Sequence, residues 1–159
     1  MNDVLFQDET FKNVLSLLEE WINDLLSPDF ITVQNMKNDF YDGIVLKNLV
    51  EKLSGQKINL PLAEDVQSKE RQLKNLAAVL DKIAHILRLT PDLVPWSLQV
   101  VYEQNLLANV QILLGLVDHF MPEGKIMLLL PKLLSVNVVQ ISMRNGRIES
   151  LVKPLTIFK

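Results

Sequence analysis

Four stretches of the chain place apolar residues three and four positions apart, which is the spacing of one face of an α-helix. They run from Phe11 to Leu26, over 39–55, over 68–87, and from about Glu103 to Phe120. Each apolar face has to be covered by another element, so four of them in 159 residues predict an all-α domain. We expect four main helices, joined by short connecting helices, around one core.

The first of these stretches has the widest apolar face. Its inward stripe is Phe11, Val14, Leu15, Leu18, Ile22 and Leu25. Leu17, Trp21 and Leu26 widen the stripe to about half the circumference, at roughly 100° per residue. Pro28 should end the helix, because proline lacks the N–H and clashes with the preceding turn. The remaining side chains are predicted to face water: Lys12, Asn13, Ser16, Glu19, Glu20, Asn23 and Asp24.

Capping residues mark the ends of the next two helices. Either Asp39 or Asp42 is expected to cap the start of the second helix, and Gly55 stands where a left-handed residue would end it. Gly43 would let a neighbouring backbone approach closely, because it has no side chain. Ser68 is predicted to cap the third helix.

After Pro122 the pattern changes from helical spacing to a run of β-branched residues that includes Val136, Val138 and Ile141. The Asn145-Gly146 pair that follows is typical of a hairpin turn. We therefore predict a strand-like or hairpin tail, packed on the helices or leading away from them. The expected organisation is an extension at 1–9, the helical domain at 10–122 and a carboxyl-terminal linker or tail at 123–159.

Charge is distributed unevenly between body and tail. Residues 1–121 hold 10 Lys and Arg against 17 Asp and Glu, a net charge of −7, whereas residues 122–159 hold 6 against 2, a net charge of +4. Proteins that bind nucleic acid normally carry a concentrated basic face. An acidic helical body therefore argues against a nucleic-acid partner.

The residues that usually carry catalysis are scarce. The chain has no cysteine, and its two histidines are His85 and His119. Asp118 precedes His119 directly, but adjacent helical residues point about 100° apart, so the two cannot act as a base and its orienting carboxylate. The glycines are scattered, and no set of metal-ligating residues recurs at ligand spacing. We expect no enzyme activity, no cofactor and no metal.

Two features of the sequence bear on the location of the protein. The first nine residues are acidic where a signal peptide would be basic, and no apolar run reaches the roughly 20 residues needed to cross a bilayer. The absence of cysteine also fits a reducing compartment. We expect a cytoplasmic protein with no transmembrane segment.

Several motifs resemble those of calponin-homology domains. The acidic-glycine step at 39–43 and the leucine-rich helix after it resemble the second main helix of that family. Three further features follow the family's order: Glu20-Trp21-Ile22-Asn23, Asn75-Leu76-Ala77-Ala78-Val79-Leu80, and a last leucine-rich helix ending at His119-Phe120. Within the family the chain is most similar to the first calponin-homology domain of the parvins, and this resemblance extends over nearly the whole chain, including Leu89-Thr90-Pro91 and the tail.

The resemblance implies an adaptor that connects integrin adhesion complexes, which contain integrin-linked kinase, to the actin cytoskeleton. It would place the protein in the cytoplasm, at the cytoskeleton and at cell-adhesion sites. Direct actin binding is expected to be weak, because the first helix carries Glu19, Glu20 and Asp24 with Lys12 as its only cation, and actin presents much acidic surface.

Two sets of residues are candidates for partner binding. Leu17 and Trp21, at one edge of the wide apolar stripe, could receive an amphipathic helix of a partner. The alternative is that both belong to the core, which is the more common role of such residues. Lys125, Arg144 and Arg147 in the basic tail could instead contact actin or microtubules directly, and the alternative there is a solvated linker.

Overall fold

The computed structural model describes residues 9–60, 68–124, 126, 137–144 and 147–154. Its four longer helices are the predicted ones, and a shorter helix and two 3-10 turns connect them, so the fold is all-α as expected. In chain order the elements are α1 (Glu9–Leu26), η2 (Ser27–Asp29), α2 (Ile44–Ser54), α3 (Lys69–Ile86), η3 (Pro91–Leu93), α4 (Leu98–Tyr102) and α5 (Leu106–Phe120).

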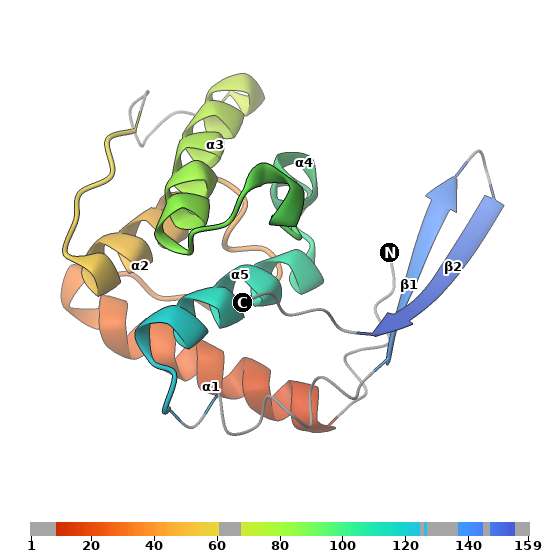
Figure 1. The fold of residues 1–159 in the computed structure, drawn as a ribbon, viewed down its shortest axis with the longest axis horizontal. Coiled ribbons are helices and arrows are strands. Elements are labelled where there is room, and N and C mark those ends of the chain that lie inside the picture. Colours follow the sequence, from red (N-terminus) through yellow and green to blue (C-terminus); the bar gives the residue numbers. More distant parts are fainter. Residues whose placement is uncertain (1–8, 61–67, 125, 127–136, 145–146, 155–159) are drawn as a thin grey trace.

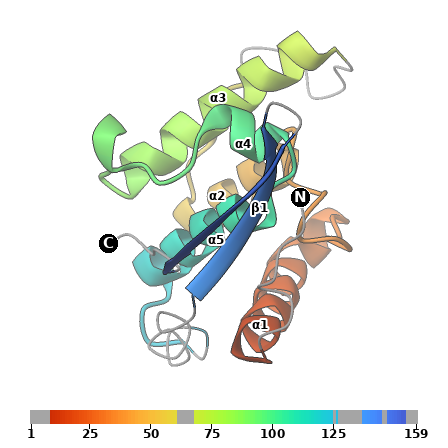
Figure 2. The same ribbon diagram turned by 90° about the vertical axis from the view of Figure 1, so that its right-hand side faces the viewer.

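Helix α5 lies at the centre of the helical body. Every residue from Leu106 to Val117 is buried, which is the expected environment of a helix that is apolar nearly all round. Figures 1 and 2 show α5 between α1 and α3. The core therefore forms around this last helix, to which the others present their apolar faces.

Helix α1 fully buries Phe11, Val14, Leu18 and Ile22 of the predicted stripe, together with Leu26, whereas Leu15 and Leu25 are only partly buried. Sequence reasoning was wrong about Asn23, which does not simply face water. Its Nδ2 donates to the Val33 carbonyl at 3.0 Å, and its Oδ1 accepts the Val33 N–H at 2.7 Å. The amide can satisfy both backbone groups at once, so Asn23 fastens the extended segment after η2 to α1.

The start of α2 depends on Gly43 more than on a capping acid. Gly43 has a φ of +81° and is buried against α3, where an added Cβ would lie 3.1 Å from the Leu76 Cα. The predicted close approach is thus confirmed. Asp42 accepts the Ile44 N–H at 3.1 Å, but Asp39 is not a cap: its carboxylate accepts the N–H groups of the 34–35 segment. Because the carboxylate of Asp39 accepts the two consecutive N–H groups of Gln34 and Asn35, it does not cap α2.

The ends of the other helices follow their capping residues. Gly55 adopts the predicted left-handed conformation, and the Ser68 hydroxyl accepts the Arg71 N–H at 3.4 Å. The last long helix begins at Leu106, three residues later than the spacing indicated, because Gln104 has a φ of +63° and Asn105 caps the new helix by accepting the Ala108 N–H. The apolar residues just before this break belong to the short helix α4.

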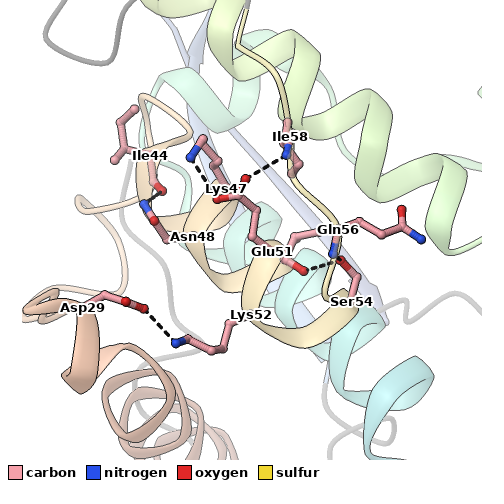
Figure 3. A network of polar contacts seen from close by, with 10 residues as sticks. Asp29, Ile44, Lys47, Asn48, Glu51, Lys52, Ser54, Gln56 and Ile58 are labelled. Carbon is pink, nitrogen blue, oxygen red and sulfur yellow. Dashed lines mark hydrogen bonds and ion pairs between the residues drawn. The ribbon is translucent and has the colours of Figure 1, made fainter.

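A polar network holds α2 to the segment that follows it (Figure 3). Glu51 pairs with Lys47 at 2.9 Å and also accepts the Ile58 N–H at 2.8 Å. Both charged side chains of the pair are largely buried, with 12% and 14% of their surface exposed. Lys52 reaches Asp29 at 3.0 Å and so connects α2 to η2.

Two strands follow the helical body. Strands β1 (Asn137–Arg144) and β2 (Arg147–Pro154) pair antiparallel, in a register that sets Asn137 opposite Pro154 and Arg144 opposite Arg147. Figure 1 shows them to one side of the helices. The Asn145-Gly146 pair expected to form the turn lies outside the described residues.

Candidate functional site

An open groove lies between α1 and the end of α5, with a volume of about 230 Å³. One wall is a single stripe of α1, because residues at positions i, i+3, i+4 and i+7 share a helix face. We call this hollow the α1–α5 groove. Its α1 wall consists of Leu17, Glu20, Trp21 and Asp24, and its opposite wall of Val117, Met121, Gly124 and Ile126.

The two walls differ in chemistry. The α1 wall alternates apolar and acidic side chains, whereas three of the four residues opposite are apolar. Glu20 and Asp24 are exposed, while Leu17 and Trp21 are partly buried against the core. The groove thus offers an apolar surface with carboxylates beside it.

Trp21 and Met121 connect the walls. The Trp21 indole Nε1–H donates to the Met121 Sδ at 2.9 Å, a contact between residues 100 positions apart in the sequence. Met121, the residue that directly follows α5, nevertheless remains 42% exposed. A flexible thioether at the surface can adjust its shape to a partner.

A second hollow is larger but less suited to an apolar partner. It lies between α1 and the 34–37 segment and has a volume of about 470 Å³. Its lining mixes Lys12 and Lys37 with Glu19, and it contains few apolar side chains. We therefore take the α1–α5 groove as the candidate functional site.

The structure brings together one pair of the predicted site residues. Leu17 and Trp21 lie in the same wall of the groove, where they are half-buried, so each combines the core and the surface roles considered for it. Lys125 lies outside the described residues. Arg144 and Arg147 oppose each other as the last pair in the register of β1 and β2, and the described structure places only their backbone.

Sequence reasoning missed part of the site. Glu20 and Asp24 were assigned only to a solvated face, although their spacing from Leu17 and Trp21 puts all four on one stripe. That spacing was a usable signal for the α1 wall. No local signal indicated that Met121 would lie opposite, because a contact across 100 residues depends on how α5 packs.

The two histidines lie at the ends of different helices. His85 lies in the last turn of α3 and His119 in the last turn of α5, and both are exposed. His119 makes an edge-to-face contact with Phe120, with ring centroids 4.7 Å apart. Within the described ranges, no three His, Asp or Glu side chains are grouped so that they could hold a metal ion.

The helices of the described part are also too short or too polar to cross a bilayer.

Comparison with known proteins gives one family and several relatives. The model of the calponin homology (CH) domain family matches residues 14–122. The chain is 35% identical to human beta-parvin over 144 residues, which are 91% of this chain and 38% of the relative. It is 31% identical to human gamma-parvin over 153 residues, 94% of this chain and 44% of the relative.

A nematode protein shows a weaker similarity. Paralyzed arrest at two-fold protein 6 of Caenorhabditis elegans is 27% identical over 144 residues, which cover 91% of this chain and 37% of the relative. The chain spans about two fifths of the length of the curated relatives it matches.

Proposed function

This chain belongs to the calponin homology domain family, with parvins among its relatives, and from that premise we propose that it acts by binding other proteins and not by catalysis. The α1–α5 groove is the observation that carries the proposal. It places the half-buried Leu17 and Trp21 beside the exposed Met121, and apolar grooves of this kind are where amphipathic helices of partner proteins dock.

The finer proposal concerns the biological setting. We place the chain as the first calponin homology domain of a parvin-like adaptor that links integrin adhesion complexes to the actin cytoskeleton. Its partners would include the integrin-linked kinase complex, and its location would be the cytoplasm at adhesion sites. Similarity to parvins over more than nine tenths of the chain supports this setting.

A second candidate is direct attachment to actin or microtubules through the tail. The net charge of +4 over residues 122–159 favours it, because both filaments present acidic surfaces. Exchanging Lys125, Arg144 and Arg147 for glutamine separates the two candidates: filament pelleting that is unchanged by the exchange eliminates the tail as the attachment site.

The proposal is tested by exchanging Leu17 for Glu and measuring both stability and partner capture. Capture from cell lysate is scored for components of integrin adhesions against actin and tubulin. Loss of capture with a nearly unchanged cooperative melt supports the groove, since Leu17 is only half-buried. A melt lowered by many degrees would assign Leu17 to the core.

Leu93→Glu provides the matched control. Leu93 lies in η3, is 59% exposed and does not line the groove. This variant introduces the same charge on the surface and should retain both the melt and the partners.

A further inference from the structure

The α1 wall of the groove repeats an apolar residue and an acid twice along the helix, as Leu17, Glu20, Trp21 and Asp24. Seven residues of helix rise about 10 Å, which is two turns. A ligand lying along this wall would therefore meet two apolar positions and two carboxylates, at the spacing that one side of a second helix presents.

The size of the groove favours side chains of a protein over a small molecule. Pockets for small-molecule ligands and cofactors usually measure roughly 300 to 1,000 Å³ and enclose most of the ligand. At about 230 Å³ the α1–α5 groove is smaller than that and lies open between its walls. A helix that inserts one or two apolar anchors suits these dimensions.

The charge of the groove selects among such helices. Glu20 and Asp24 are the charged side chains among the described residues that line it, and both are exposed acids. Acidic residues on a docking helix would face like charges at close range, which opposes binding, whereas Lys or Arg would find opposite charges. Trp21 lines the same wall, and an aromatic ring can attract a cation.

We propose that the α1–α5 groove binds an amphipathic helix of a partner protein that carries Lys or Arg along the border of its apolar face. This inference rests on the proposed function and deepens it, because it names the chemistry of the partner. The apolar anchors contact Leu17, Trp21 and Met121, and the basic residues pair with Glu20 and Asp24.

The test uses two synthetic helices of about 15 residues that share the same leucine positions, one with Lys and one with Glu beside them, each without tryptophan. Binding to the whole chain is followed by calorimetry and by the change in tryptophan emission, to which Trp21 in the groove and the buried Trp96 both contribute. We expect the Lys helix to bind at least tenfold more tightly than the Glu helix at low salt, and the difference to shrink as salt is added.

A charge exchange on the protein makes the test specific. The double variant Glu20→Lys and Asp24→Lys should lose at least tenfold in affinity for the Lys helix and gain affinity for the Glu helix. Glu70→Lys with Asp81→Lys, two exposed acids of α3, changes the net charge equally and should leave both affinities unchanged.

Each outcome has a distinct meaning. If both helices bind the wild-type chain equally, the basic partner is refuted while docking in an apolar groove stands. If neither helix binds, a basic amphipathic helix is refuted as the occupant of the groove, whereas the proposed function is decided separately by the capture experiment with Leu17→Glu. If the α3 control abolishes binding as strongly as the groove variant, the attraction is a general charge effect and the inference is overturned. A chain that dimerises in sedimentation, and stops doing so when Leu17 is exchanged for Glu, would assign the groove to a second copy.

Discussion

Replacing Gly43 with alanine measures how closely α2 and α3 pack. The new Cβ would lie 3.1 Å from the Leu76 Cα, 3.4 Å from its Cδ1 and 3.5 Å from the Val79 Cγ2. The closest of these atoms is backbone, so it cannot move aside by changing rotamer. The φ of +81° is a second obstacle, because L-residues are strained in that region.

The magnitude follows from these two obstacles. A left-handed conformation costs alanine about 1–2 kcal/mol relative to glycine. Inserting a methyl group into a packed interior typically costs about 1–3 kcal/mol. We therefore expect Gly43→Ala to lower the free energy of unfolding by about 2–5 kcal/mol, and the melting temperature by roughly 4 °C for each kcal/mol in a domain of this size.

Gly55 provides the matched control. Its φ of +71° imposes the same conformational cost, but nothing lies within 4 Å of the position that a Cβ would take. Gly55→Ala should therefore lose only about 1–2 kcal/mol. Urea unfolding of the three proteins, with a common slope, gives the two differences directly. If Gly43→Ala and Gly55→Ala are destabilised equally, within about 0.5 kcal/mol, the close helix contact contributes nothing and the reasoning is wrong.

Four further predictions concern other parts of the molecule. Burial raises the pKa of Glu51. The hydrogen bond from the Ile58 N–H and the nearby Lys47 ammonium lower this pKa by more, so it lies below the ordinary 4.5. The stability that Glu51 contributes is therefore present above pH 4.5 and fades as the pH falls through the lower folded value, and the gap between wild type and Glu51→Gln should close in acid melts. Asn23→Ala should cost about 1–3 kcal/mol in urea unfolding, because the Val33 N–H and carbonyl lose their partner, and Asn23→Asp, which keeps only the acceptor, should recover part of it. Phe30→Gly should raise stability by up to about 1 kcal/mol in thermal melts, since Phe30 is 97% exposed at a φ of +59°. Cosedimentation with actin at physiological salt should show a dissociation constant weaker than about micromolar, because the exposed charges of α1 are mostly acidic, and tighter binding would refute this.

The helices could be predicted because the signals that define them are local. Apolar spacing placed α1, α2 and α3, and the residues at their ends have conformational preferences that act within one turn, as Ser68 and Gly55 show. The prediction was wrong about where the last helix begins. It placed the start at about Glu103, yet Glu103 and Gln104 form a turn after α4, and Asn105 caps the helix that begins at Leu106.

The candidate site could be predicted only on one side. Spacing alone places Leu17, Glu20, Trp21 and Asp24 on a single stripe of α1. Whether that stripe is core or surface depends on how much of it the end of α5 covers. Met121 contacts Trp21 but remains exposed itself, so the stripe is covered only in part. The half-buried state of Leu17 and Trp21 therefore had no signal in the sequence.

The sequence by itself determined an all-α chain, the apolar faces of its main helices and the glycine at which two helices approach closely, because periodicity and backbone preference are properties of neighbouring residues. Only the tertiary structure decided that Asn23 binds the backbone of Val33, and that a mixed apolar and acidic stripe of α1 lines one open groove together with Met121, which is 100 residues from Trp21. The spacing of residues predicts which side chains share a helix face, but it does not predict which distant element covers that face.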